Sequence, residues 1–255
     1  MEHVLTQNLE KVKLQAVVSK QELYNRVVRS YGQLCAAAKA LDVIGDRWTL
    51  LIVRELLIRE AARYTDLRVG LPGIATNLLA ERLRDLEQAG IVRRYDAPPP
   101  VATALFELTD RGRQLEPVLA ALGRWGAPLL AQADDQDAFR THWLALPARL
   151  HLSDREPDSP PITIELRTGD EPLSISTSDG HIDARPGAAA HPDLVLTGPP
   201  QPVMSVLLGR LDLNDATGRG VRYEGDPAVL RRIQPEASPP SDADALAAAG
   251  LVGRL

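Results

Sequence analysis

The feature that most limits how this chain can fold is the segment 64–90, in which two helical patterns flank a short turn. The first pattern, Tyr64–Val69, ends in a Gly-Leu-Pro-Gly turn whose proline disfavours helix at the residue before it. Thr76 is expected to cap a second helix, which stops at Gly90. Its leucines recur at helical spacing and predict one buried face, formed by Leu79, Leu83 and Leu86. The outward face carries Asn77, Ala80, Glu81, Arg84 and Gln88.

The elements expected around this segment complete a winged helix-turn-helix. Two helices are predicted before it, over 36–41 and 49–58. The second has Trp48, Leu51, Ile52 and Leu56 on its buried side. After it, residues 91–95 and 105–108 predict a hairpin with Pro98, Pro99 and Pro100 in its tip, and residues 109–130 predict a long helix. This order of elements is that of a winged helix-turn-helix domain.

Such a fold inserts the second helix of segment 64–90 into the major groove of DNA, N-terminus first. The residues expected at base edges are Thr76, Asn77 and Ala80. Asparagine can bond adenine bidentately, and a small alanine admits a thymine methyl group. The arginines expected to reach phosphates are Arg47, Arg68, Arg82, Arg84 and, at the base of the hairpin, Arg94. The alternative is that Thr76 is only a cap and that the arginines pair with Glu81, Asp85 or Glu87.

The length and composition limit the number of domains, the metal and disulfide sites and the partners that this chain can have. Its 255 residues suggest two modest domains. A single cysteine excludes an internal disulfide framework and a multi-cysteine zinc site. No run of about 18 apolar residues and no secretory signal pattern is present, so we expect a cytoplasmic protein with no membrane partner. The net charge is −5, and the acidic excess lies beyond residue 131, so DNA binding must depend on a local surface.

Residues 136–235 predict a small α+β domain after the winged helix-turn-helix domain of 31–131. Its first helix contains Phe139, Trp143 and Leu144. Strands are expected over 162–167, 173–177, 181–184, 194–197 and 222–224, and helices over 202–208, 213–216 and 227–233. Asp179-Gly180 is a hairpin signal. Residues 1–30 are expected to be an extension, helical over 9–28 or disordered, and residues 236–255 a flexible tail.

Residues 31–131 resemble the HxlR-type winged-helix regulators, which are related to the MarR group. The resemblance is carried by Tyr31, Cys35–Ala38, Ala40–Leu57, Tyr64–Arg68, Gly70–Ile74, Asn77–Leu79, Glu81–Glu87, Ala89–Ile91 and Leu108–Gly112. It implies a bacterial homodimeric transcription factor that binds a palindromic operator. It also implies that the dimer is made by the first and last helices of the region, here about 34–41 and 113–130. The hairpin tip departs from the family because it lacks basic residues, with only Arg93 and Arg94 at its base.

Residues 136–235 resemble, more faintly, a sterol-carrier-protein-type domain. The similar segments are Ile162–Leu166, Asp179-Gly180, Asp193–Thr197, Val203–Leu208, Gly209–Leu211 and Gly220–Leu230. The resemblance implies a sheet and covering helices around an apolar cavity that binds a small apolar effector. The residues expected to line it are Trp143, Leu144, Leu207 and Leu208. These side chains could equally form an ordinary filled core, because apolar positions alone do not distinguish a cavity from a core.

Cys35 has two interpretations. Some family members sense oxidants or electrophiles through a cysteine followed by proline near this position, whereas Ala36 follows Cys35 here. A redox sensor needs an exposed thiolate stabilised by a helix N-terminus or by positive neighbours, and Lys39 lies one turn further on. The alternative is a small buried hydrophobe in the dimer helix.

Motifs for other chemistry are weak. His181 with Asp183, and His191 with Asp193, place a histidine and an acid two residues apart, but a metal needs three or four converging ligands. No nucleophile elbow, phosphate-binding glycine loop or zinc-protease motif is present, so we expect neither an enzyme nor a cofactor. The sequence therefore predicts a ligand-modulated transcriptional regulator. The alternative is a carrier of small apolar molecules whose helical domain only dimerises.

Overall fold

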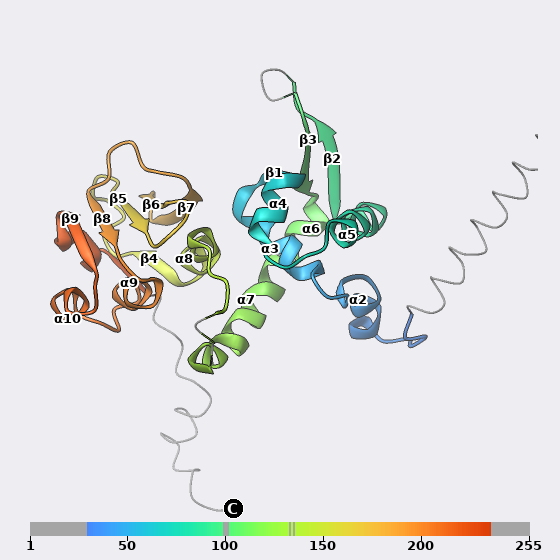
Figure 1. Cartoon of the computed structure of the whole chain (residues 1–255), viewed down its shortest axis with the longest axis horizontal. Coiled ribbons are helices and arrows are strands. Elements are labelled where there is room, and N and C mark those ends of the chain that lie inside the picture. The colour runs from blue at the N-terminus through green and yellow to red at the C-terminus, as the bar shows by residue number, and fades with distance from the viewer. Residues whose placement is uncertain (1–29, 99–101, 133, 135, 236–255) are drawn as a thin grey trace, which may run out of the picture.

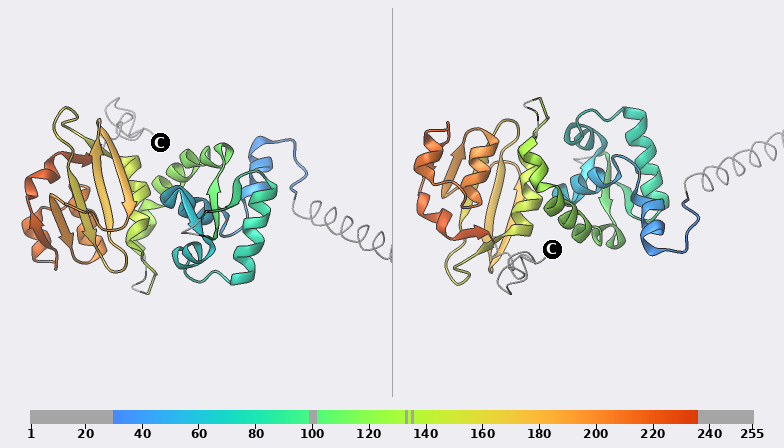
Figure 2. Two further views of the ribbon diagram at one scale, coloured as in Figure 1. Left: turned by 90° about the horizontal axis from the view of Figure 1, so that it is seen from above. Right: turned by 90° about the horizontal axis from the view of Figure 1, so that it is seen from below.

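The chain forms two domains that lie side by side (Figures 1 and 2). The computed structural model describes residues 30–98, 102–132, 134 and 136–235, and each domain has a hydrophobic core of its own. The helix predicted over 9–28, the tail 236–255 and two of the hairpin prolines, at positions 99 and 100, lie outside the described residues. None of the helices in the described part of the chain combines the length and hydrophobicity that a membrane span requires.

The N-terminal domain has the predicted order of helices and hairpin. Its elements are α2 (Ala36–Ile44), α3 (Thr49–Arg59), β1 (Ala61–Arg63), α4 (Tyr64–Gly70), α5 (Thr76–Gln88), β2 (Val92–Asp96), β3 (Ala104–Leu108), α6 (Asp110–Arg113), α7 (Glu116–Gly126) and the 3-10 helix η1 (Ala127–Gln132). The strands form an antiparallel sheet in the order β1-β3-β2. The β2–β3 hairpin projects from the domain in Figure 1. The core contains the predicted leucines of α5 together with Ile52 and Leu56 of α3.

Three local features of this domain differ from the prediction. β1 was not predicted, because a three-residue strand is too short to show an alternating pattern. Thr76 is the first residue of α5 and not its cap, since Ala75 occupies the N-cap position and no side chain caps the helix. Leu51, expected to be buried, is 39% exposed.

The helix predicted over 109–130 is broken into α6, α7 and η1. Thr109 caps α6, and its hydroxyl accepts a hydrogen bond from the Gly112 amide at 3.1 Å. Gly112 packs so closely on the preceding hairpin that an added Cβ would lie 2.2 Å from the Ile91 carbonyl oxygen. Pro117 lies in the first turn of α7, a position where proline is favoured. Because proline has no backbone N–H to donate, α6 cannot continue as an unbroken helix through this position. The chain therefore turns between α6 and α7.

The C-terminal domain is a five-stranded sheet with helices packed on its apolar face. Its elements are η2 (Thr141–Leu144), α8 (Ala145–His151), β4 (Leu152–Asp154), β5 (Thr163–Arg167), β6 (Leu173–Ser178), β7 (His181–Pro186), β8 (Leu194–Thr197), α9 (Pro200–Leu207), α10 (Leu213–Thr217), β9 (Arg222–Gly225), η3 (Pro227–Arg231) and β10 (Ile233–Pro235). The strand order is β7-β6-β5-β8-β9, in which only the β5–β8 pair is parallel. Alternate residues of β5 and β6 face the core, among them Ile164, Leu166, Leu173 and Ile175.

The hairpin predicted at Asp179-Gly180 joins β6 to β7. Both turn residues have positive φ angles, +51° and +80°, as a two-residue hairpin of this kind requires. The helix predicted over 227–233 is instead the short η3 followed by β10. β10 pairs with β4, and the two strands form a separate two-stranded sheet that the sequence did not indicate.

A buried ion pair fastens this small sheet. Arg232 donates two hydrogen bonds to the Asp154 carboxylate, from Nε at 2.6 Å and from Nη2 at 2.8 Å. Nη1 and Nη2 also donate to the carbonyl oxygens of Pro160 and Ser159. These hydrogen bonds from Arg232 lower the pKa of Asp154 below its ordinary value. The ion pair therefore joins Arg232, just before β10 at the end of the domain, to β4, the first strand of the domain.

We expect Asp154→Asn to lower the free energy of unfolding by about 3 kcal/mol at pH 7, because it leaves a buried guanidinium without its counter-charge. Urea unfolding followed by circular dichroism measures this change. The double variant Asp154→Leu with Arg232→Met removes both charges and should recover most of the loss.

The same pair predicts a pH dependence. A carboxyl with a lowered folded pKa stabilises the fold above its unfolded pKa of about 3.9, and this contribution is lost as the pH falls through the folded value. The free energy of unfolding of the wild type should therefore drop more steeply than that of Asp154→Asn between about pH 5 and pH 2. Parallel slopes for the two proteins would contradict this role for Asp154.

Candidate nucleic-acid interface

The helix-turn-helix unit consists of α4, the turn 71–75 and α5. The side chains of Leu67, Leu71 and Leu79 are fully or almost fully buried between the two helices. Gly73 in the turn has a φ of +85°, in the left-handed region that favours glycine. The Tyr64 hydroxyl donates to the Thr76 carbonyl oxygen at 2.5 Å, which ties the start of α4 to the start of α5. The position of the second helix is thus set by packing and by one direct hydrogen bond.

The N-terminal turn of α5 is open to solvent. Thr76 and Asn77 are exposed, and Ala80, one turn further along, is partly exposed. The three residues predicted to meet base edges are therefore on the accessible side of the helix. Whether they contact bases remains a prediction.

The two arginines of α5 have different environments. Arg82 is 8% exposed, and its Nη1 lies 2.8 Å from Asp46 and 2.6 Å from Asp85. This is the carboxylate pairing that the sequence left open as the alternative to a phosphate contact, and it holds α5 to the loop between α2 and α3. Arg84 is exposed, and its Nε donates to the Ala80 carbonyl oxygen within the same helix at 3.2 Å. Of the two, Arg84 is the one that a phosphate can reach.

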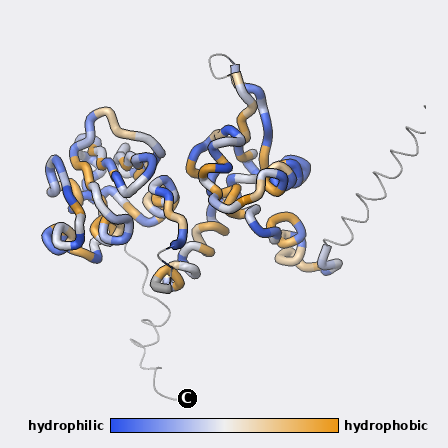
Figure 3. The backbone as a smooth tube through the Cα atoms, viewed as in Figure 1, coloured by the Kyte–Doolittle hydropathy of each residue, from blue (hydrophilic) through white to orange (hydrophobic). Residues whose placement is uncertain are grey.

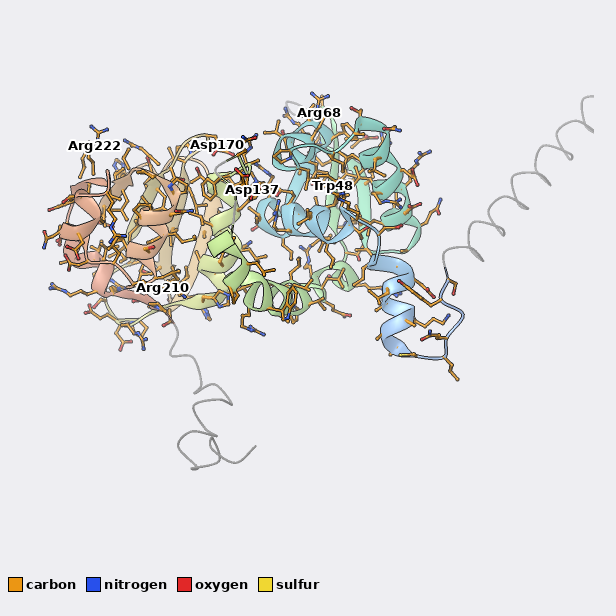
Figure 4. All side chains as sticks on the ribbon, turned by 60° about the horizontal axis from the view of Figure 1, so that its bottom comes forward. Trp48, Arg68, Asp137, Asp170, Arg210 and Arg222 are labelled. Carbon is orange, nitrogen blue, oxygen red and sulfur yellow. The ribbon has the colours of Figure 1, made fainter. Side chains whose placement is uncertain are left out.

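Four further arginines lie around the unit: Arg47, Arg68, Arg93 and Arg94. Arg47 and Arg68 are exposed, and Figure 4 shows Arg68 at the outer edge of the domain. On β2, Arg93 pairs with Glu107 of β3 directly opposite it. Arg94 is exposed and points to the other face of the hairpin, because side chains alternate along a strand. The structure thus separates a structural arginine in the hairpin from one that remains accessible.

Cys35 is exposed at the N-cap of α2. Hydrogen bonds from the backbone amides of Ala38 and Ala37 lower the pKa of its thiol. In the single chain the thiol is therefore not buried, and the exposure and helix N-terminus that a sensor needs are both present. Burial of the thiol in a dimer stays a prediction. Redox sensing itself stays a prediction.

The predicted ligand-contacting residues of the C-terminal domain lie in and beside its packed core. Leu144 and Leu207 are buried in that core, and Leu208 packs against it from the edge. Trp143 faces the N-terminal domain, where its indole Nε1 donates to Glu55 of α3 at 2.9 Å. The filled-core alternative thus fits the leucines, and Trp143 does not point into a cavity of its own domain. Among the described residues no three histidine, cysteine or acidic side chains converge as metal ligands would.

An apolar groove of about 340 Å³ opens on the N-terminal domain between α2, α3 and α7. It is lined by Leu41, Ile44, Gly45, Asp46, Trp48, Leu50, Leu51, Val118 and Leu122. Exposed apolar residues continue past it along α7 and η1, where Trp125 is 76% exposed. Figure 3 shows hydrophobic positions along α2 and α7. We call this surface the α2–α7 groove, and it explains why Leu51 is exposed.

Sequence reasoning missed Glu55 and His142. Both are buried, and His142 Nε2 lies 2.8 Å from Glu55 Oε2. A signal was present in the sequence, because Glu55 follows Ile52 by three residues and so occupies the buried face of the helix. A charged side chain at such a position needs a partner. Nothing in the sequence indicated that the partner lies in the other domain.

Comparison with known proteins matches the N-terminal domain. A family model described as HxlR-like helix-turn-helix matches residues 43–134. The uncharacterized HTH-type transcriptional regulator YvaP of Bacillus subtilis is 36% identical over 87 residues, which cover 34% of this chain and 80% of YvaP. The uncharacterized HTH-type transcriptional regulator sll1512 of Synechocystis is 36% identical over 101 residues, 40% of this chain and 74% of sll1512. Among solved structures, the reduced form of the regulator YodB of B. subtilis is 29% identical and covers 40% of this chain and 100% of YodB, with a TM-score of 0.35.

The contrast between Arg82 and Arg84 predicts different effects on stability. Arg82→Ala should lower the free energy of unfolding by about 2 kcal/mol, because Asp46 and Asp85 lose the guanidinium that joins them. Arg84→Ala, two residues along the same helix, should change it by no more than about 0.5 kcal/mol. Chemical denaturation of both variants measures the difference, and equal losses would refute this assignment of the two side chains.

Proposed function

The chain belongs to the HxlR-like helix-turn-helix family, and on that basis we propose that it is a transcriptional regulator that binds a palindromic operator as a homodimer. The observation that carries the proposal is the accessible N-terminal turn of α5 on a rigid helix-turn-helix unit. In this proposal the C-terminal domain modulates DNA binding.

Base recognition falls to the first turn of α5. Asn77 is exposed there and has the amide geometry to bond adenine bidentately, while Ala80 leaves room for a thymine methyl group. Thr76 adds a hydroxyl at the helix start. A 13-residue helix whose opposite face is buried can enter a major groove with this turn leading.

Phosphate contacts fall to the accessible arginines. Arg47, Arg68, Arg84 and Arg94 are exposed around the helix-turn-helix unit and the base of the hairpin, whereas Arg82 is already paired. Each phosphate neutralised contributes about 0.9 to the slope of log K against log salt. Four candidates per monomer make eight in the proposed dimer, so the slope should be no steeper than about −7.

The α2–α7 groove supports the homodimer. Its apolar side chains are exposed in a single chain, and contiguous exposed apolar surface marks an interaction site. A second copy of this chain is the occupant we propose, because a two-fold related pair would carry two α5 helices to successive major grooves of a palindrome.

The regulatory role of the C-terminal domain is supported by its direct attachment to α3. An effector that favours one placement of this domain over another would change operator affinity through that attachment. The effector class follows from the resemblance of residues 136–235 to a sterol-carrier-protein-type domain. An apolar small molecule is therefore the effector class we propose to test first.

The recognition assignment predicts that Asn77→Ala with Arg84→Ala weakens operator binding by about 30-fold or more, since it removes one bidentate base contact and one phosphate contact. The measurement is a mobility shift on the DNA upstream of the protein's own gene, with excess competitor DNA and a salt series. Gln88→Ala, exposed at the far end of the same helix, is the matched control and should bind as the wild type does. A wild-type shift that competitor removes would favour the carrier alternative.

The dimer assignment predicts that Leu122→Asp converts the protein to a monomer, because it places a carboxylate in the α2–α7 groove. Sedimentation equilibrium measures the mass. Tyr223→Asp changes a comparably exposed residue on β9 of the other domain, and this control should remain dimeric. A Leu122→Asp protein that stayed dimeric would place the dimer contact elsewhere.

A further inference from the structure

The carboxylate of Glu55 lies in the contact between the two domains and is completely buried. Two donors come from the C-terminal domain: Trp143 Nε1 lies 2.9 Å from Oε1, and His142 Nε2 lies 2.8 Å from Oε2. Two more come from Arg54 of α3, whose Nη2 lies 2.7 Å and Nε 3.2 Å from Oε1. Arg59 Nε lies 3.8 Å from Oε2, an ion-pair contact without a hydrogen bond. Oε1 therefore accepts hydrogen bonds from both domains, and Oε2 lies between the His142 donor of one domain and the positive charge of Arg59 in the other.

The hydrogen-bonding pattern of His142 fits this role. A carboxylate only accepts, so the Nε2 atom of His142 carries the hydrogen that is donated to Glu55. Its Nδ1 is then an acceptor and faces Arg59 Nη2 at 3.5 Å. The ring thus needs one donor and one acceptor at fixed positions, an arrangement that a glutamine amide can reproduce.

On its other side, Glu55 packs against the end of α4. A Cβ atom at Gly70 would lie 2.0 Å from Glu55 Oε2, so only glycine fits there while the carboxylate keeps its place. Arg54 Nη2 also reaches the Gly70 carbonyl oxygen at 3.4 Å. Gly70 is the last residue of α4 and directly precedes the turn that positions α5. The carboxylate therefore contacts the C-terminal domain and the helix-turn-helix unit at once.

Neighbouring contacts keep the same surfaces together. The Arg54 guanidinium stacks on the Trp143 ring, 4.5 Å from its centre. Arg140 Nε of the C-terminal side reaches the Val69 carbonyl oxygen of α4 at 3.5 Å. At the far end of α3, Arg149 Nη2 donates to the Leu57 carbonyl oxygen at 2.8 Å. This last contact joins the domains without touching Glu55.

We propose that Glu55 is a positioning residue that transmits the placement of the C-terminal domain to the helix-turn-helix unit, so that operator affinity depends on the hydrogen bonds donated by His142 and Trp143. The inference rests on the proposed DNA binding. When the C-terminal domain moves away, Glu55 loses two donors, and a buried charge without donors is strongly disfavoured. The carboxylate must then turn toward water, and the end of α4 loses the surface against which Gly70 packs. The docked arrangement holds the unit preorganised, so it is the state that binds DNA more tightly.

The test compares variants of the full-length chain that alter the donors and leave α5 unchanged. Trp143→Phe keeps an aromatic ring beside Arg54 and removes the N–H donor together with part of the bicyclic side chain. His142→Ala removes the second donor, and His142→Gln supplies both a donor and an acceptor. Arg149→Met is the matched control, because it breaks a buried contact between the domains that does not involve Glu55.

The readout is the dissociation constant for the DNA fragment that the wild type prefers, measured by fluorescence anisotropy, beside the thermal unfolding midpoint of each protein. We expect Trp143→Phe and His142→Ala to weaken binding by about five- to 150-fold, the usual range for coupling between sites. His142→Gln should recover most of the affinity lost in His142→Ala. Arg149→Met should lower the unfolding midpoint and leave the affinity within about twofold of the wild type, a margin smaller than the weakest coupling expected.

The outcomes separate the inference from the proposed function. If the wild type prefers no DNA sequence, the proposed function fails and the inference fails with it. If the wild type binds its fragment and the folded Trp143→Phe protein binds equally or more tightly, the function stands and the inference is overturned. Loss of affinity in Arg149→Met equal to that in Trp143→Phe would also overturn it, because general destabilisation would then explain both.

Discussion

The arrangement of the two domains depends on one buried carboxylate. Glu55 is fully removed from water on the buried face of α3, with Ile52 and Leu56, and ionised groups in such places need several donors. Two of its hydrogen bonds come from His142 and Trp143 of the C-terminal domain, and two come from Arg54 of α3. Moving the domains apart would leave the charge partly unsatisfied, so two units with separate cores are held as one at α3. Ile58 of the same helix, which packs into the C-terminal core, extends this attachment.

The arginines of the N-terminal domain fall into two groups: those already paired with a carboxylate and those that remain accessible. Arg82 is buried among carboxylates and Arg93 is paired across the hairpin, so both contribute to the structure. Arg68, Arg84 and Arg94 remain accessible around α5 and the hairpin base. An acidic protein can present a DNA-binding surface in this way, because phosphate attraction depends on local uncommitted charge and not on the total.

The helix-turn-helix elements were predictable because their signals are local. The spacing of the α5 leucines, the glycines of the turn and the stop at Gly90 act within a few residues of one another. The strands β1, β4 and β10 were not predictable, since each has three residues and its partner lies far along the chain. The break between α6 and α7 had its proline signal, but the close approach of Gly112 to the hairpin exists only in the folded chain.

Local sequence patterns were enough to predict the order of helices and hairpin in the N-terminal domain, the alternation of the C-terminal strands and the set of side chains that could meet DNA. Periodicity and turn chemistry encode these features directly. The folded structure was needed to show which arginines are already paired with carboxylates, that Leu51 lines an open groove, and that Trp143 makes a contact between the domains. Each of these depends on which distant residues become neighbours. A side chain that is charged or apolar in sequence acquires its role only when burial and its partners are set.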